Sequence, residues 1–311
     1  MQLLYFFESI RNPLCDAFFS FITEFGDETL FMVVGMIFFW CVNKFTGYYL
    51  LITGFFGTVI NQFLKLIFRI PRPWVKDPNF TVVGNAKDGA GGFSFPSGHT
   101  QTSVGLFGGV ARANKNKVLK IVSIALCVLV PLSRMYLGVH TPLDVGVSVA
   151  IALIMVFAFY PLFKKAEKSP KVMYGIITAL GVLVVAFMLY VYLYPFPDSV
   201  YLPENVINLQ SAVKNAHTLL GCMLGFLVVY FVDTNYVKFE VKAVWWAQIL
   251  KVIGGLACVL LVKEVLRFPI DFICSGHIIG RTIRYFLMVV VGGVVWPLTF
   301  KWFARLGKKN G

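Results

Sequence analysis

The sequence predicts an all-α protein, a polytopic bundle of about nine transmembrane helices. Hydrophobic residues make up 58% of the 311 positions and only 14% are charged, against about a quarter in a soluble domain. The apolar residues form runs long enough to cross a bilayer, which takes about 20 residues. The basic residues lie in short loops between these runs, so membrane orientation explains the net charge of +13 better than nucleic-acid binding does. We therefore expect a protein of the lipid bilayer that binds no nucleic acid.

The first predicted element is an interfacial helical segment over residues 1–28. Acidic residues are spread through this apolar stretch and no basic region precedes it, so we expect no cleaved signal peptide. A segment of this kind lies at the membrane surface or is partly inserted. The apolar runs that follow cover about 29–43, 47–68, 98–113, 118–135, 142–162, 172–194, 211–232, 245–266 and 282–304.

These runs divide into a transmembrane core over residues 29–165 and a C-terminal part, 166–311, with about four spans. The longest polar loop, 69–97, is rich in Pro, Gly, Asp and Asn, and long ordered loops often carry function. Two glycine pairs with GxxxG spacing, Gly105/Gly109 and Gly221/Gly225, indicate close helix packing. The six cysteines form no CxxC pair and are expected to be small buried hydrophobic residues.

Positive charge is distributed unevenly between the two sides of the predicted bundle. Alternating spans place the basic loops on one side, which the positive-inside rule makes cytoplasmic. Loop 69–97, residues 136–141 and loop 267–281 then face away from the cytoplasm, as does YPFPDSVYLPENV, which has no Lys or Arg. The basic residues assigned to the cytoplasmic side are Lys44, Arg112, Lys115, Lys117, Lys120, Lys164, Lys165, Lys168, Lys171, Lys238, Lys242, Lys301, Arg305, Lys308 and Lys309.

Three polar motifs meet on the outer side. KLIFRIPRP ends the second span, FPSGHT begins the third, and SRMYLGVHTPLD joins the fourth to the fifth. Unpaired cations near a membrane surface are costly, and arginine forks match phosphate oxygens, so we expect the cations to share a phosphate. The backbone N–H groups that open the third span would add to an anion site. The polar residues of the motifs are Lys65, Arg72, Ser97, His99, Ser133, Arg134, His140 and Asp144, with Gly98 beside them.

Two histidines beside a phosphate site suggest a nucleophile and a general acid. Asp144 follows His140 by four residues, so its carboxylate can bind one ring nitrogen and present the other as nucleophile. Structural roles remain open for the same residues. Asp144 also fits a capping box with Thr141, and Lys65 and Arg72 also fit anchors that reach the membrane surface.

In order and spacing, these motifs resemble the signature of the type 2 phosphatidic acid phosphatase (PAP2) superfamily, in its integral-membrane lipid phosphatase branch. The signature reads K-x6-RP, PSGH and SR-x5-H-x3-D, and the resemblance covers roughly residues 45–160. It implies a five-helix PAP2-like catalytic core that needs no metal or other cofactor. It further implies that His140 is the nucleophile forming a phosphohistidine, that His99 is the general acid and that Asp144 orients His140. The implied phosphate-binding residues are Lys65, Arg72, Ser97, Gly98 and Arg134.

The resemblance implies a phosphatase acting on a lipid phosphate or diphosphate of the membrane. Candidate substrates are polyprenyl diphosphate, phosphatidic acid, phosphatidylglycerol phosphate and a sphingoid phosphate. A lipid phosphotransferase using the same intermediate is an alternative, and so is a phospholipid-binding transporter or scaffold, which would leave the two histidines unexplained. We expect a bacterial plasma membrane with an extracytoplasmic site. The terminal KKNG leaves the endoplasmic reticulum with a lumenal site as an alternative, and the oligomeric state stays open.

Five charged residues near the ends of the last two spans also reach the predicted outer side. We expect interfacial anchoring and an internal ion pair, and a second basic subsite for a diphosphate is the alternative. His217 and His277 match no motif and are assigned no role. The five charged residues are Lys263, Glu264, Arg267, Arg281 and Arg284.

Overall fold

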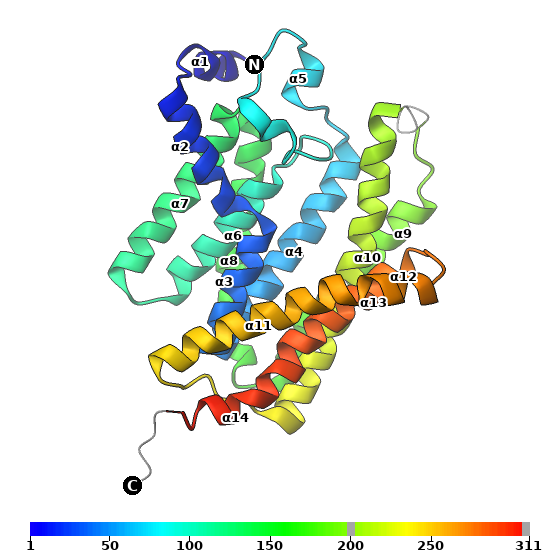
Figure 1. Cartoon of the computed structure of the whole chain (residues 1–311). Coiled ribbons are helices and arrows are strands. Elements are labelled where there is room, and N and C mark those ends of the chain that lie inside the picture. Colours follow the sequence, from blue (N-terminus) through cyan, green and yellow to red (C-terminus); the bar gives the residue numbers. More distant parts are fainter. Residues whose placement is uncertain (198–202, 307–311) are drawn as a thin grey trace. The chain divides into compact units, whose positions relative to one another are not determined.

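A computed structural model describes residues 1–197 and 203–306 of the chain, so the predictions for KKNG and for the middle of YPFPDSVYLPENV lie outside the described residues. Within the described part the regular structure is helical and contains no strand, which confirms the all-α prediction (Figure 1). The chain is an integral membrane protein. Its helices long and apolar enough to cross a membrane are Lys44–Lys76, Lys117–Tyr136, Pro142–Ala166, Pro170–Leu193, Val206–Val237 and Ile279–Phe303.

The described residues thus give six candidate spans, or seven if the bent pair Pro13–Gly26 and Glu28–Val42 is one span, where the sequence predicted about nine. Predicted span 98–113 is a helix of 16 residues, about 24 Å long at 1.5 Å per residue and shorter than a roughly 30 Å hydrocarbon core. Predicted span 29–43 is bent by 54° from the helix before it. Predicted span 245–266 is helical but is not among the six.

One compact unit comprises Met1–Met32, Tyr49–Lys164 and Phe196–Ala212, and it holds the three motifs. Its helices run in both directions, so the motif loops and the basic α6–α7 turn lie at opposite helix ends (Figure 1). Its elements are α1 (Gln2–Ser9), α2 (Pro13–Thr23), η1 (Glu24–Gly26), the start of α3 (Glu28–Ile37), most of α4 (Lys44–Phe68), α5 (Pro73–Lys76), η3 (Gly84–Lys87), α6 (Gly98–Ala113), α7 (Lys117–Tyr136), most of α8 (Pro142–Ala166) and the start of α10 (Pro203–Val232).

The other compact unit comprises Val33–Tyr48, Lys165–Pro195 and Val213–Gly311. The predicted division of the chain at residues 28 and 165 stays a prediction. The elements of this second unit, besides the adjoining ends of α3 and α4, are η2 (Phe38–Val42), α9 (Pro170–Leu193), α10 (Pro203–Val232, from Val213), η5 (Asp233–Val237), α11 (Trp245–Val265), α12 (Arg267–Ile273), α13 (Ile279–Val290), η6 (Val291–Val295), η7 (Trp296–Thr299) and α14 (Phe300–Phe303).

Several helices begin where the sequence supplies a capping residue. Asn12 precedes α2 and accepts a hydrogen bond from the Cys15 backbone N–H at 3.0 Å, with Pro13 at the first helical position. Asn116 precedes α7 and accepts from the Leu119 N–H at 3.0 Å. These side chains satisfy donors that have no partner within the helix, and so they fix where each helix starts.

Glycine spacing sets two of the close helix contacts. A Cβ built on Gly109 of α6 would lie 2.7 Å from Leu50 of α4, and one on Gly221 of α10 would lie 2.3 Å from the Thr282 carbonyl oxygen of α13. A Cβ on Gly105 would meet no atom within 4 Å. A Cβ on Gly225 would lie 2.6 Å from Val289, so the predicted packing role holds for both glycines of the Gly221/Gly225 pair and, in the other pair, for Gly109 alone.

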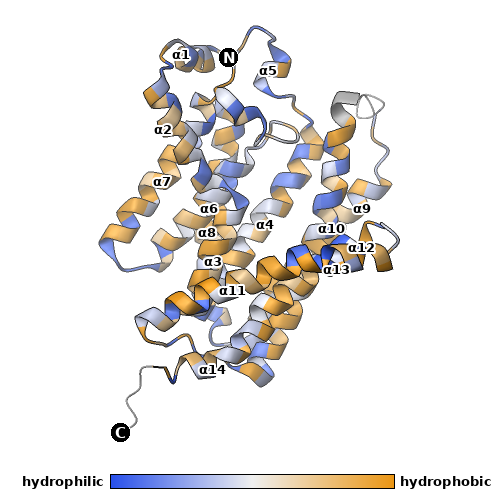
Figure 2. Cartoon of the chain, viewed as in Figure 1, coloured by the Kyte–Doolittle hydropathy of each residue, from blue (hydrophilic) through white to orange (hydrophobic). Residues whose placement is uncertain are grey.

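The exposed face of α7 is apolar (Figure 2), and the exposed side chains of α9 are apolar as well. Such faces suit contact with lipid, because hydrocarbon solvates them without cost. Each face therefore belongs in the bilayer rather than in water. Its exposed residues include Ile121, Val122, Ile124 and Val128 on α7, and Val182, Val185, Leu189 and Leu193 on α9.

Candidate active site

Three cationic side chains of the first unit are buried at the motif end of its helices. Lys65 in the last turn of α4, Arg72 just before α5 and Arg134 in the last turn of α7 are 8%, 6% and 2% exposed. Lys65 donates to the Phe93 carbonyl oxygen. Among the described residues, none of the three forms a salt bridge. Buried cations without a carboxylate partner favour binding of an anion.

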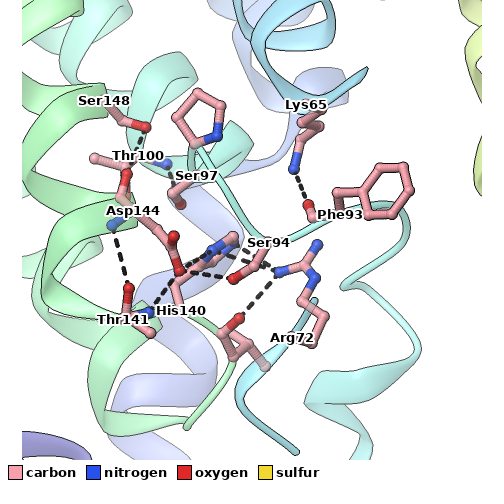
Figure 3. Close-up of polar contacts among 12 residues, drawn as sticks. Lys65, Arg72, Phe93, Ser94, Ser97, Thr100, His140, Thr141, Asp144 and Ser148 are labelled. Carbon is pink, nitrogen blue, oxygen red and sulfur yellow. Dashed lines mark hydrogen bonds and ion pairs between the residues drawn. The ribbon is translucent and has the colours of Figure 1, made fainter. Parts of the chain in front are cut away.

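Arg72 is held by the loop between α5 and α6 and by the α7–α8 turn. Its Nη2 donates to the Gly91 carbonyl oxygen at 2.7 Å and its Nε donates to that of Gly92 at 3.1 Å. Its Nη1 donates to the Val139 carbonyl oxygen at 3.0 Å and lies 2.9 Å from His140 Nε2 (Figure 3). The guanidinium therefore ends at the imidazole ring in a fixed orientation.

His140 follows α7 and is 1% exposed. Its Nδ1 faces Asp144 Oδ2 at 3.6 Å, while its Nε2 faces the Arg72 donor. An arginine N–H can only donate, so Nε2 is the unprotonated nitrogen and Nδ1 carries the hydrogen toward the carboxylate. Burial, reinforced by Arg72, Arg134 and Lys65, holds the His140 pKa well below its ordinary value. The ring is therefore neutral at pH 7, with a lone pair on Nε2.

Asp144 both caps α8 and faces His140. Its Oδ2 accepts from the Thr141 backbone N–H at 2.7 Å, and Thr141 Oγ1 accepts from the Asp144 N–H at 3.3 Å. These reciprocal bonds form a capping box. The same Oδ2 accepts from Ser94 Oγ at 2.6 Å (Figure 3). The capping and orienting interpretations are therefore compatible, because one fixed carboxylate oxygen can serve both.

The N-terminus of α6 supplies the second motif. Ser97 caps the helix, with its Oγ accepting from the Thr100 N–H at 3.4 Å, and its own N–H donates to the Asp144 carbonyl oxygen at 3.1 Å. The backbone at Gly98 is open, since a Cβ there would meet only Asn61 Oδ1, at 3.9 Å. That oxygen is buried and has no hydrogen-bond partner. The helix start therefore presents backbone donors in an uncrowded position.

His99 lies in the first turn of α6, within electrostatic range of Arg134, Arg72, Lys65 and His140. The structure thus brings all the predicted site residues together at one end of α4, α6, α7 and α8. The Nε group of Arg134 is buried and has no hydrogen-bond partner, so it remains a donor for a bound oxygen. Two histidines, three cations and a helix N-terminus around one point can bind a phosphate and attack its phosphorus.

The sequence did not indicate two neighbours of these residues. Ser94 bonds Asp144 and lies two positions before the PSGH motif, so its closeness to that motif was the available signal. Thr23 accepts a hydrogen bond from Arg134 Nη1 at 2.7 Å. It lies 111 residues from Arg134, in the predicted interfacial segment, where no motif includes it and spacing carries no signal.

The charged residues near the ends of the last predicted spans make their contacts within the second unit. Lys263 and Glu264 form the expected ion pair at 3.9 Å. Arg281 Nε donates to Thr218 Oγ1 at 2.6 Å, and its guanidinium lies over the Tyr285 ring. These contacts favour the anchoring role for the charged residues. The second phosphate subsite stays a prediction.

Comparison with models of known protein families shows to which family the chain belongs. The model of the PAP2 superfamily matches residues 44–168, and that of the PAP2 superfamily phosphatase transmembrane extension matches residues 217–309. The chain belongs to the PAP2 superfamily. It is a membrane lipid phosphatase, a hydrolase of phosphoester or diphosphate bonds. No solved structure shows a significant match.

Three curated relatives of this PAP2 protein each align with about half of the chain. Undecaprenyl-diphosphatase BcrC of Bacillus subtilis is 29% identical over 49% of the chain and 77% of its own length. A probable sphingosine-1-phosphate phosphatase of Dictyostelium discoideum is 28% identical over 49% of the chain and 39% of its own length. Phosphatidylglycerophosphatase B of Bacillus subtilis is 26% identical over 48% of the chain and 75% of its own length.

Proposed function

We propose that this PAP2 protein removes phosphate from a lipid phosphate or diphosphate through a phosphohistidine on His140, without a metal. One observation carries the proposal. His140 Nε2 and Arg72 Nη1 lie 2.9 Å apart, while Asp144 faces the other ring nitrogen. A phosphate oxygen bound by Arg72 would therefore place phosphorus next to the nitrogen that has the lone pair.

In the first step His140 Nε2 attacks phosphorus and the bond from phosphorus to the leaving oxygen breaks. His99 gives its proton to that oxygen. Burial, reinforced by Arg134, lowers the pKa of His99 to about 3, so the ring holds this proton only beside the negative charge of the bound phosphate, which raises its pKa. Lys65, Arg72 and Arg134 neutralise the charge on the equatorial oxygens, and such preorganised electrostatics supply much of the rate enhancement. Their burial supports this role, because charges act more strongly where water is excluded.

In the second step His99 accepts a proton from water, and the water oxygen attacks the phosphorus of the phosphohistidine. The P–N bond breaks, inorganic phosphate leaves and His140 regains its lone pair. Asp144 stabilises the ring while it carries positive charge. A lipid phosphotransferase would differ only here, with a lipid hydroxyl in place of water.

The substrate class follows from the site and the relatives together. The named activities of the relatives share a phosphate joined to a membrane lipid. We therefore propose polyprenyl diphosphate, phosphatidic acid, phosphatidylglycerol phosphate or a sphingoid phosphate as the substrate. The apolar outward faces of the helices support entry of the lipid tail from the bilayer.

The proposed location is a bacterial plasma membrane with the site on the extracytoplasmic face. The α6–α7 turn carries Lys115 and Lys117, at the opposite helix ends from the motifs. By the positive-inside rule, that turn is cytoplasmic and the motif end is not. Two of the relatives are bacterial, which supports the choice of membrane.

A phosphate-release assay on purified protein in detergent tests this function. The assay compares the four lipid phosphates with and without EDTA, and it contains no acceptor alcohol. We expect inorganic phosphate from at least one lipid, unchanged by EDTA and absent with His140→Ala. Consumption of the lipid phosphate only after an alcohol is added, with the phosphoryl group recovered on that alcohol and not as inorganic phosphate, would favour the phosphotransferase. Loss of activity in EDTA would contradict metal independence.

A further inference from the structure

Helix α2 and the turn η1 precede both stretches that the family models match, yet they pack against α6 and α7. Thr23 ends α2, and its Oγ1 accepts a hydrogen bond from Arg134 Nη1 at 2.7 Å. Both side chains are buried, with Thr23 only 8% exposed. One arm of the arginine fork is thus anchored by the N-terminal segment, while the buried Nε has no partner. The anchored donor fixes the direction in which the free donor points.

The same segment contacts His99. A Cβ built on Gly26 of η1 would lie 2.9 Å from both the Cβ and the carbonyl oxygen of His99, and 2.9 Å from Val130 of α7. Only glycine allows η1 to approach the start of α6 this closely. The Asp27 carboxylate follows at once, within electrostatic range of the His99 ring. Residues 23–27 therefore meet two of the three motifs.

Residues 11–16, in the first half of this N-terminal segment, contact the end of α7 and the turn that follows it. Arg11 Nη2 donates to the Tyr136 carbonyl oxygen at 3.2 Å, and Tyr136 Oη donates to Asp16 Oδ1 at 2.7 Å. Gly138 has φ of +83°, and a Cβ there would lie 2.8 Å from Arg11 Nη2. These contacts hold the segment against the same end of α7 that carries Arg134, so the Thr23 contact is part of a larger interface.

We propose that Thr23 is a positioning residue, which orients Arg134 toward the phosphate of the substrate. The inference rests on the proposed function, because that proposal assigns Arg134 to phosphate binding. Removing the hydroxyl leaves Nη1 buried without an acceptor and frees the guanidinium to turn. Because a hydrogen bond to a charged group is lost, we expect Thr23→Val to lower kcat about 10-fold to 100-fold. The melting temperature should fall by a few degrees at most, because one buried donor loses its acceptor.

The test measures kcat and KM for phosphate release, together with stabilisation of the protein by orthovanadate, a phosphate analogue. Thr23→Ser should retain activity within about threefold, since it keeps the acceptor. Thr29→Val is the matched control, because Thr29 is exposed and uses its backbone N–H to bind Asp27. Thr23→Ala replaces the valine variant if that variant does not fold.

A double-mutant cycle with Arg134→Gln identifies the partner through which Thr23 acts. We expect the Thr23 substitution to have no further effect once Arg134 is replaced. Unchanged kcat and vanadate stabilisation in the single variant, or full additivity in the cycle, would overturn the inference while leaving the proposed function intact. A wild-type protein that neither releases phosphate nor responds to vanadate would instead overturn the proposed function.

Discussion

The two compact units both bury charged side chains, but they provide them with different partners. In the second unit Lys44 Nζ contacts Asp233 Oδ2 at 2.8 Å, and Lys251 Nζ donates to the carbonyl oxygens of Trp40 and Val241 at 2.8 and 3.0 Å. In the first unit Lys65, Arg72 and Arg134 are buried within electrostatic range of one another, and none of them forms a salt bridge among the described residues. A buried cation is therefore not in itself a sign of function. A group of buried cations without a carboxylate partner is such a sign.

Two buried histidines show the same contrast. His217 contacts Tyr192 Oη and Thr282 Oγ1, each at 2.8 Å, so neutral hydroxyls occupy both ring nitrogens. His140 lies between the Asp144 carboxylate and the Arg72 guanidinium. Each neutral ring has one unprotonated nitrogen, but only that of His140 lies beside an arginine that can bind phosphate. The contacts of His217, which matched no motif, are those of a structural residue.

The largest expected effect separates these two histidines. His140→Gln removes the nucleophile and should lower kcat at least about 10⁴-fold, as loss of a nucleophile does in other hydrolases. His217→Gln can keep hydrogen bonds to both hydroxyls and should retain kcat within about threefold. Phosphate release from the best lipid substrate measures both variants. Equal losses would show that the contrast between the two sites has no catalytic meaning.

The next largest effect on kcat is expected at the Asp144 carboxylate, which is compared with the Asp233 carboxylate of the second unit. Asp144→Asn keeps a capping oxygen but removes the charge beside His140, and it should lower kcat about 10²-fold to 10⁴-fold with the fold intact. Asp233→Asn removes the partner of Lys44 and should lower the melting temperature without lowering kcat. Wild-type turnover with Asp144→Asn would leave that residue with the capping role alone.

A smaller effect is expected at Ser94, which the sequence did not indicate. Ser94→Ala removes the hydroxyl that holds Asp144 Oδ2 and should lower kcat roughly 10-fold, as loss of supporting hydrogen bonds does at other sites. The matched control is Ser148→Ala, because Ser148 donates to the Asp144 main-chain oxygen. Comparable kinetics for the two variants would argue against a role for Ser94 in orienting the carboxylate.

The smallest effect on catalysis is expected at Lys251. Lys251→Met keeps the length of the side chain but leaves the carbonyl oxygens of Trp40 and Val241 without this donor, and it should lower the free energy of unfolding by about 1–3 kcal/mol. Unfolding in detergent measures the loss, and kcat should stay unchanged. A fall in kcat with an unaltered free energy of unfolding would mean that a buried cation of the second unit also affects catalysis. That result would contradict the distinction drawn between the two units.

The sequence predicted the catalytic unit better than it predicted the membrane crossings. Three motifs with fixed spacing named eight residues, from Lys65 to Asp144, that the structure gathers at one end of four helices. Motif spacing reports chemistry that needs particular residue types. Hydropathy reports only apolar length, so it did not separate the 16-residue α6 from a full span or detect the 54° bend between residues 26 and 28.

The sequence could not predict the contacts of Thr23 and Ser94, and the reason there is different. Thr23 and Arg134 are separated by 111 residues, and a threonine in an apolar stretch is ordinary. Ser94 meets Asp144 only because the loop before α6 returns to the start of α8, which is a tertiary contact. Side chains that support a site are fixed by packing, so a single sequence identifies the reacting groups more readily than their supports.

The most direct test of the account is to trap the phosphorylated enzyme. His99→Ala should still be phosphorylated by a lipid phosphate with a good leaving group, but it should lose the base that activates water. Mass spectrometry at neutral pH, combined with a ³²P-labelled substrate, then locates the bound phosphate. We expect one acid-labile phosphate per chain on the His140 peptide. Phosphate on another residue, or release of phosphate by His140→Gln at the wild-type rate, would contradict the account.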